Sequence, residues 1–248
     1  MGKREKLCLN QVTLVAVSSV HMYETVRALK YSMRKIVYED VLLLSDQKPF
    51  YLPADIRFER IGRLENVDMY SRFMVYELHK YIESDFALII HHDGFVVNPF
   101  LWRDEFLTYD YIGAPWRLPL PEESRYRDRD GNVCRVGNGV SLRSKALMRL
   151  PDEQGWEWKR IASGTYNEDC FLYCDNKHRV EAAGLKIAPI EVAKYFSHEQ
   201  MIPEIEGIEP FLFHQWRGKN KKYPKFRNYP ELIRRKYGLQ GKGKAFFG

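Results

Sequence analysis

The sequence predicts an α/β fold in one domain, with a mixed, mainly parallel central sheet flanked by helices and a basic C-terminal extension. A continuous apolar run at 86–90 is typical of a strand that is buried on both faces. Similar runs alternate with segments whose apolar residues recur at helical spacing, as in sheets built with right-handed crossovers. Residues 217–248 hold 11 of the 39 Lys and Arg residues and one of the 33 Asp and Glu residues, so they carry +10 and the preceding residues −4.

The first half of the chain alternates regularly between the two kinds of element. Short apolar or alternating runs predict four strands, at 12–17, 40–45, 57–61 and 86–90. Apolar residues at helical spacing predict helices over 23–37 and 69–82, and Asp68 is expected to cap the second of them.

The second half is less regular. A strand is expected at 109–116, and an exposed loop rich in Pro, Gly and charge at 118–132. Two glycines around Asn138 permit a positive φ and a close approach to a ligand, although a simple hairpin turn explains them equally well. Later elements are expected as a helix at 145–150 capped by Ser144, a helical region from 167 to Gly184, and a strand at 186–190.

Polar residues end the central strand abruptly, because His91, His92, Asp93 and Gly94 follow the apolar run at once. Open α/β sheets place their ligands at this carboxyl edge. In an extended chain His91 and Asp93 point to the same side, and an imidazole with a carboxylate can bind a divalent metal. A strand end with locally capped histidines accounts for the same residues, but the abrupt break in so apolar a run favours a site.

Several classes of protein are disfavoured by what the sequence lacks. Neither a G-x-G-x-x-G fingerprint nor a P-loop occurs, which argues against an ordinary dinucleotide-binding dehydrogenase or P-loop kinase. The four cysteines do not show zinc-site spacing, so a reducing compartment is the simpler expectation. No run approaches the roughly 18 apolar residues of a membrane span, and the basic start leads into no signal-peptide core. We therefore expect a cytoplasmic protein.

The basic extension at 217–248 suggests an anionic partner, which could be a membrane surface, a lipid-linked phosphate or nucleic acid. Aromatic residues are interleaved with its basic residues, as is typical of peripheral membrane contact and of nucleic-acid binding. A solvated tail that only aids solubility explains the charge equally well.

Six stretches of the chain, taken together and in order, resemble nucleotide-sugar-dependent glycosyltransferases of the GT-A type. The resemblance is closer to an uncharacterised group of bacterial proteins of that fold. The matching stretches are YSRFMVYEL (70–78), FALIIHHDGFVVNP (86–99), YIGAPW (111–116), VGNGVSLRS (136–144), NEDCFLY (167–173) and FLFHQW (211–216). This implies a domain over 1–216, with a nucleotide-sugar-binding half at 1–99 and an acceptor-binding half at 100–216, before the basic tail.

The resemblance also implies a metal site for Mn²⁺ or Mg²⁺. Residues 91–94 stand where these enzymes carry an Asp-x-Asp motif, and Asp93 matches its final Asp, the usual direct ligand. His91 replaces the first Asp, which is a departure from the pattern. His214 resembles the late histidine that completes the metal shell, and His198 is the alternative for that role.

Further roles are implied residue by residue. Glu168 and Asp169 resemble an acidic pair whose Asp is the general base in inverting members. Four residues are expected to bind the donor: Ser18, Asp46, Arg72 and His92. Four others are expected to bind the acceptor: Trp116, Asn138, Gly139 and Trp216. Ordinary packing of a large aromatic is the commoner explanation for each tryptophan taken alone.

The resulting hypothesis is a metal-dependent, inverting glycosyltransferase that moves a sugar from a nucleotide-sugar donor to a glycan or glycolipid acceptor. Surface polysaccharide or lipopolysaccharide synthesis at the inner membrane face would suit such an enzyme. One alternative is a nucleic-acid-binding protein that uses the tail, although the tail contains no recognised binding module. Another is a GT-A domain that binds sugar nucleotides without catalysis. A metal phosphohydrolase ranks last, because its His-Asp sites usually lie on helices.

Overall fold

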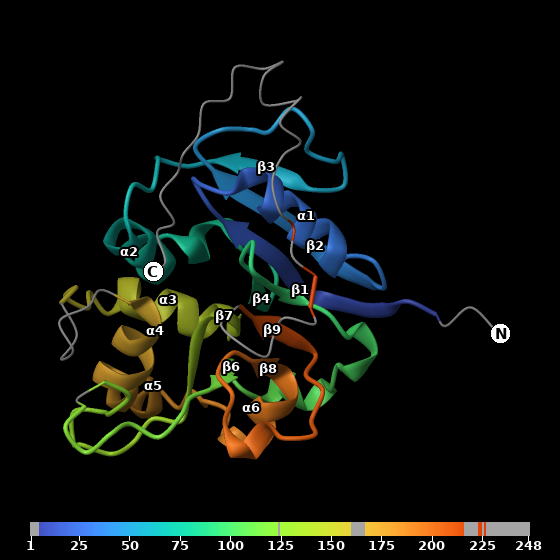
Figure 1. The fold of residues 1–248 in the computed structure, drawn as a ribbon. Coiled ribbons are helices and arrows are strands. Elements are labelled where there is room, and N and C mark those ends of the chain that lie inside the picture. Colours follow the sequence, from blue (N-terminus) through green and yellow to red (C-terminus); the bar gives the residue numbers. More distant parts are fainter. Residues whose placement is uncertain (1–4, 124, 160–166, 216–222, 225, 227–248) are drawn as a thin grey trace.

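The computed structural model describes residues 5–123, 125–159, 167–215, 223–224 and 226 of the 248-residue chain. A six-stranded sheet lies at its centre, in the order β3-β2-β1-β4-β7-β6 (Figure 1). Its strands are β1 (Leu7–Val17), β2 (Ile36–Ser45), β3 (Arg57–Arg60), β4 (Phe86–Ile89), β6 (Tyr111–Pro115) and β7 (Val136–Ser144). The β1–β2, β1–β4 and β2–β3 pairings are parallel, whereas β7 runs antiparallel to β4 and β6. The predicted mixed, mainly parallel sheet in a single domain is therefore confirmed.

A second, small sheet has the order β5-β9-β8, and the chain enters it through β5 directly after β4. Its strands are β5 (Gly94–Val96), β8 (Ser197–His198) and β9 (Leu212–His214). The helices are α1 (Met22–Ser32), α2 (Val67–Tyr76), α3 (Lys145–Glu153), α4 (Glu168–Cys170), α5 (Lys177–Ala182) and α6 (Ile190–Phe196). Shorter turns of helix are η1 (Leu78–Tyr81), η2 (Pro99–Leu101), η3 (Asp104–Thr108), η4 (Phe171–Asp175, a π-helical turn) and η5 (Pro203–Ile205). Among the described residues, no helix combines the length and the apolar character that crossing a membrane requires.

The two faces of the central sheet carry separate apolar layers, because successive side chains of a strand point to opposite faces. Leu14 and Ala16 of β1 pack in the layer that contains Val26 and Leu29 of α1. Val15 and Val17 pack in the layer on the other face, with residues of α2, η1 and α3. The continuous apolar runs of the central strands are thus covered on both faces, as predicted.

Some element boundaries differ from the sequence prediction for local reasons. The side chain of Asn66, not Asp68, caps α2 by accepting a hydrogen bond from the Met69 N–H at 2.9 Å. The predicted strand at 186–190 is only an isolated bridge between Ile187 and Tyr111, since Pro189 lies next and α6 begins at Ile190. The 136–144 stretch is the nine-residue strand β7 and not a hairpin turn.

Gly137 of β7 makes room for a buried aromatic side chain. A Cβ added there would lie 1.7 Å from Cζ2 of Trp116, whose indole is only 2 % exposed. We expect Gly137→Ala to lower the free energy of unfolding by about 1–3 kcal/mol, because the added methyl group forces the core apart. Urea denaturation would measure the loss. Gly62→Ala is the matched control, since an added Cβ at Gly62 meets no atom within 4 Å; equal stability of both variants would contradict the packing argument.

Most of the basic extension lies outside the described residues, but two of its aromatic residues pack on the domain. Phe226 stacks on Phe95 of β5 with ring centroids 4.9 Å apart, and it also contacts Tyr31. Tyr223 packs against Phe213 of β9 at 4.5 Å. These two residues are therefore partly buried against the hydrophobic core of the domain.

Candidate metal centre and adjoining pocket

The chain turns sharply between the two sheets at residues 91–94. The N–H of His91 donates to the Gly94 carbonyl at 2.8 Å, and the N–H of Gly94 donates back to the His91 carbonyl. This tight turn carries the chain from the end of β4 into β5. The polar residues that end the apolar run therefore lie between the two sheets, at the carboxyl edge of the parallel strands.

Strand β9 brings His214 to this turn from the far end of the sequence. Gly94 lies opposite His214 in the β5–β9 pairing, and the Gln215 N–H donates to the Asp93 carbonyl at 2.9 Å. A Cβ on Gly94 would lie 2.7 Å from Cδ2 of His214 and 2.6 Å from Cγ2 of Val140. Only glycine therefore allows this close approach of the two strands.

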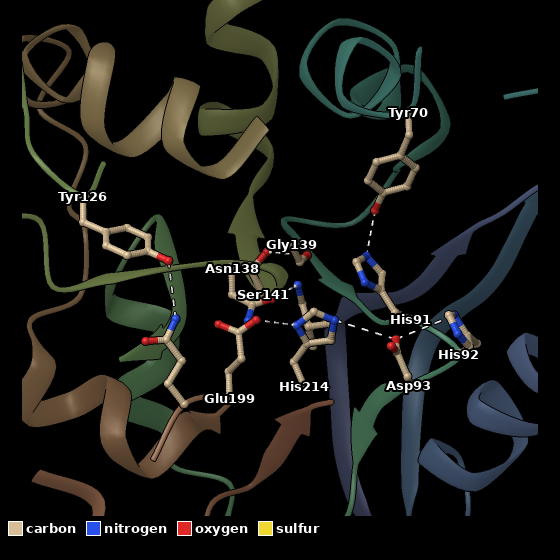
Figure 2. Close-up of polar contacts among 12 residues, drawn as sticks. Tyr70, His91, His92, Asp93, Tyr126, Asn138, Gly139, Ser141, Glu199 and His214 are labelled. Carbon is tan, nitrogen blue, oxygen red and sulfur yellow. Dashed lines mark hydrogen bonds and ion pairs between the residues drawn. The ribbon is translucent and has the colours of Figure 1, made fainter. Parts of the chain in front are cut away.

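His91, Asp93 and His214 form a three-residue cluster whose candidate ligand atoms all lie within 4.8 Å of one another. His214 Nε2 lies 3.7 Å from Asp93 Oδ1, and the rings of His91 and His214 are 5.2 Å apart. Figure 2 shows His214 facing Asp93, with the ring of His91 nearby and directed to Tyr70. Two imidazoles and a carboxylate suit divalent transition metals and Mn²⁺, so the donor set fits the metal that the resemblance implies.

The protonation states of His91 and Asp93 are those of metal ligands. Burial lowers the pKa of His91 to about 3, so its imidazole is neutral at physiological pH. Burial alone would raise the pKa of Asp93, but the facing charges of His214 and the neighbouring histidines hold it below its ordinary value. A metal ion binds the neutral imidazole and the ionised carboxylate, and these forms need no proton removal at neutral pH.

Two further side chains orient the histidines of the cluster. Tyr70 Oη hydrogen-bonds to His91 Nε2 at 2.8 Å, and His214 Nδ1 donates to Glu199 Oε1 at 3.1 Å (Figure 2). Burial would lower the pKa of His214, but the bond to Glu199 and the charge of Asp93 raise it overall. With Nδ1–H held by a carboxylate, Nε2 faces Asp93, which is the arrangement that commonly surrounds metal-bound histidines.

Two further histidines, His92 and His21, extend the cluster toward α1. The ring of His21 stacks on His92 with centroids 4.3 Å apart, and His92 Nδ1 lies 3.6 Å from Asp93 Oδ1. His21 occupies the N-cap position of α1 with a φ of 50°, which is uncommon for a residue other than glycine. Four of the seven histidines of the chain therefore surround Asp93 or its direct neighbours.

A pocket opens beside the cluster, between the ends of β1 and β4 and the start of α2. Its lining includes Ser18, Tyr70, His91 and His92, together with apolar residues such as Ile90. Ser18 Oγ is hydrogen-bonded to the Val20 carbonyl inside the same turn. Of the four residues expected to bind the donor, Ser18 and His92 therefore line this inner pocket.

The other two expected donor residues lie elsewhere in the described part of the chain. Asp46 follows β2, and its carbonyl accepts a hydrogen bond from Arg60 Nη1 at 2.7 Å. Arg72 is exposed and lines a second pocket on the outer side of α2. Tyr70 and Arg72 are two residues apart on α2, so they point to nearly opposite sides of the helix.

The acidic pair opens α4 close to the cluster, and its two members have different surroundings. Glu168 is buried and forms an ion pair with Arg143 at 3.0 Å, with side-chain exposures of 7 % and 1 %. A Cβ on Gly139 would lie 3.0 Å from Cε1 of His91 and 3.1 Å from Oε1 of Glu168, so both side chains converge on Gly139. Burial and the charge of Glu168 raise the pKa of Asp169 to about 6, so near neutral pH it can accept a proton.

The residues expected to bind the acceptor have different surroundings. Trp116 packs against Tyr126, with ring centroids 4.5 Å apart, and its faces are used inside the core. Asn138 is buried with a φ of 115°, and its Oδ1 accepts a hydrogen bond from the Val140 N–H at 2.8 Å. Trp216 lies outside the described residues. His198, the alternative metal ligand, hydrogen-bonds through Nε2 to the Lys194 carbonyl at 2.7 Å.

Four residues of this centre were not found by sequence reasoning: His21, Tyr70, Arg143 and Glu199. Tyr70 and Arg143 lie within the stretches 70–78 and 136–144 that carry the family resemblance, but the resemblance implied roles only for other residues of those stretches. Glu199 directly follows His198, so its sequence position gave a weak signal at most. Each of the four acts through a contact with a residue distant in sequence, which periodicity does not reveal.

The raised pKa of Asp169 predicts a stability that depends on pH. Because the folded pKa is about 6 against an ordinary 3.8, the native state binds more protons than the unfolded state between these values. Stability therefore falls as pH rises through this window, by up to about 3 kcal/mol at 1.36 kcal/mol per pH unit. Partial exposure of Asp169 should make the measured loss smaller.

Asp169→Asn removes this ionisation and should unfold at a higher temperature than the wild type at pH 7.5, with the difference vanishing near pH 4. Thermal melts in chelator across this range would measure it. Asp55→Asn, which changes an exposed carboxylate, provides the control. A pH-independent difference for Asp169→Asn would contradict the raised pKa.

Comparison with known proteins places the chain in a family but assigns no activity. No curated protein gave a significant match. The sequence model of one family, described as "Protein of unknown function (DUF5672)", matches residues 55–214. The match runs from the loop before β3 to the end of β9, and it includes His91, Asp93 and His214. The chain therefore belongs to this DUF5672 family.

Proposed function

We propose that the protein is a metal-dependent glycosyltransferase that moves a sugar from a nucleotide-sugar donor to a glycan or glycolipid acceptor. The observation that carries the proposal is the convergence of His91, Asp93 and His214 beside a pocket at the carboxyl edge of the parallel strands. A ligand with a diphosphate group could fill this pocket and reach the cluster from it. The ordered resemblance of the six sequence stretches supports the same class.

Each residue of the centre has a chemical task in such a transfer. Asp93, His91 and His214 would hold Mn²⁺ or Mg²⁺, which when bound stabilises a diphosphate leaving group as a Lewis acid. Tyr70 and Glu199 would fix the orientation of the two imidazoles. These residues would thus keep the centre ordered before the donor arrives.

Asp169 would be the general base. Its carboxylate would take the proton from the acceptor hydroxyl as that oxygen attacks the anomeric carbon, and the configuration there would invert. A pKa of about 6 leaves most Asp169 ionised at pH 7 while keeping it basic enough to accept a proton. General-base assistance of this kind typically contributes about 10²–10⁴-fold. Arg143 would neutralise Glu168 and so keep a second negative charge from facing the base uncompensated.

The test combines binding and turnover. Thermal shifts with a panel of nucleotide sugars, with and without Mn²⁺, would identify the donor, because a ligand at 100 times its Kd adds about 2.7 kcal/mol. Release of nucleoside diphosphate would then be measured for wild type and Asp169→Asn. We expect one donor to give a metal-dependent shift, and Asp169→Asn to keep that shift while losing turnover by about 10²–10⁴-fold.

Other outcomes would point elsewhere. Donor binding without any nucleotide release would favour a protein that has lost catalysis. The motivating feature for this alternative is that His91 replaces the first Asp of the Asp-x-Asp motif. A shift with random RNA or DNA and with no donor would favour nucleic-acid binding through the basic tail. Either result would remove the transferase proposal.

The location at the inner membrane face is part of the same proposal and rests on the charge of residues 217–248. Because Tyr223 and Phe226 pack against the core, the appropriate truncation removes only residues 227–248. This truncated protein should sediment less with vesicles containing anionic lipid than the full chain does. Undiminished sedimentation would argue against the tail as a membrane contact.

A further inference from the structure

A second groove lies on the outer side of α2, facing the segment that follows α3. Helix α2 and its neighbourhood contribute one wall, with Leu64, Met69, Arg72, Phe73, Tyr76 and Glu77. The other wall consists of Trp156 and Trp158. The mixture is therefore aromatic and charged, which is typical of sites that bind small polar ligands with apolar faces.

The aromatic rings of this outer groove are fixed by hydrogen bonds within the protein. The indole N–H of Trp158 donates to Asp68 Oδ1 at 2.7 Å, and that of Trp156 donates to Gln154 Oε1 at 2.9 Å. Tyr76 Oη donates to the Trp156 carbonyl at 2.7 Å. Trp156 is almost fully buried, whereas Trp158 and Tyr76 are partly exposed. A ligand would therefore meet ring surfaces that are already oriented.

The groove is connected to the proposed catalytic centre on two sides. Leu64 lines both the outer groove and the inner pocket. Trp158 packs against Phe171 with ring centroids 4.7 Å apart, and Phe171 lies two residues after Asp169. One wall of the groove is thus anchored on the helical turn that carries the proposed base.

The charged side chains make the groove suitable for hydroxyl groups. Arg72 is exposed, and no described residue forms an ion pair with it. Glu77 is the C-cap of α2, five residues after Arg72, and it forms a surface ion pair with Lys80 at 2.9 Å. A guanidinium provides several N–H donors in a plane, and a carboxylate provides acceptors. Such a pair can bind neighbouring hydroxyls while the rings contact the C–H face of the same ligand.

We propose that the outer groove binds the saccharide chain of the acceptor, and this rests on the transferase function proposed above. The sugar that receives the transfer would lie near Asp169, and sugars further along the chain would stack on Trp158 and Tyr76. Arg72 would bind hydroxyl groups of this chain and not the donor diphosphate. An aliphatic lipid fits the groove less well, because the charged side chains of Arg72 and Glu77 line it.

The experiment uses the full chain and defined probes: linear tri- to hexasaccharides of glucose, galactose, mannose and N-acetylglucosamine, each titrated without donor. Quenching of tryptophan fluorescence reports binding near Trp156 and Trp158. We expect at least one oligosaccharide to bind, Trp158→Ala to weaken it at least tenfold, and Arg72→Ala to weaken it at least threefold. Trp102→Ala is the matched control, because Trp102 is also partly buried and bonds to Asp104 far from the groove in sequence.

Arg72→Ala protects the test against misfolding, since this exposed side chain can be removed without opening the core. Failure of every oligosaccharide to bind, or equal affinities of wild type and both groove variants, overturns the proposal. Donor turnover is measured separately. The wild type could release nucleoside diphosphate while the groove variants keep an unaltered acceptor KM. This result would support the transferase function and contradict acceptor binding in the groove. If the groove variants lose saccharide binding but no protein releases nucleoside diphosphate, the groove proposal would stand and the transferase proposal would fall.

Discussion

Asp93→Asn is expected to lower the affinity for Mn²⁺ by more than about 100-fold. Asp93 is the sole carboxylate of the three-residue cluster, and an amide oxygen carries no charge to replace it. Substituting a residue that only orients a metal ligand typically lowers metal affinity about 10–100-fold, so loss of the charged ligand itself should lower it further. Glu199→Gln should accordingly fall within the 10–100-fold range, because Glu199 only holds His214.

Isothermal titration with Mn²⁺, Mg²⁺, Zn²⁺ and Fe²⁺ would measure these affinities without any substrate. Asp55→Asn is the matched control, since it removes an exposed carboxylate from a loop outside the cluster. Equal Mn²⁺ binding by Asp93→Asn and the control would rule out the cluster as the metal centre. Fe²⁺ and Zn²⁺ should bind this donor set more tightly than Mn²⁺, following the general order of affinities of divalent metals for nitrogen and oxygen ligands.

Arg143→Met should destabilise the protein by about 3–5 kcal/mol. The substitution leaves Glu168 as a buried charge without its partner, and such a charge keeps its desolvation cost while losing the attraction that offset it. Because this approaches the whole stability of many domains, part of the variant should be unfolded at 37 °C. Urea denaturation followed by circular dichroism would measure the loss.

The companion variants separate the ion pair from general packing. Arg143→Met combined with Glu168→Leu should recover most of the stability, because apolar replacements of a buried pair are often neutral. Arg149→Met provides the surface control, since Arg149 and Glu153 form an exposed pair that should contribute at most about 1 kcal/mol. A double variant as unstable as Arg143→Met would show that volume and not charge dominates at this position.

The sequence predicted the core of the fold well, because its signal is local. Continuous apolar runs at 12–17, 40–45 and 86–90 correspond to β1, β2 and β4, whose side chains are buried on both faces. The turn at 91–94 was predicted as a ligand site for the same reason, since polar residues there interrupt a buried strand. Local pattern alone was enough to find these strands, whereas the ligand site at the turn stays a prediction.

The rest of the centre depends on contacts between distant parts of the chain. His214 meets Asp93 only through the β5–β9 pairing, and from sequence it could be proposed only through a family resemblance. The resemblance implied a donor contact for Arg72, whereas Tyr70, two residues earlier on α2, is the residue that hydrogen-bonds to His91. Trp116 was expected to bind the acceptor, but its indole is buried in the core, where the absence of a side chain at Gly137 leaves room for it.

The order of strands in the central sheet has a consequence for how the chain can be divided. The family match begins at residue 55, whereas β1, which pairs with both β2 and β4, ends at Val17. A fragment of residues 55–214 would leave β4 with an unpaired, wholly apolar edge, and such edges promote aggregation. The matched segment is thus an evolutionary unit but not a folding unit. Its central strand must come from the first residues of the chain, so folding has to close a long loop before the sheet can assemble.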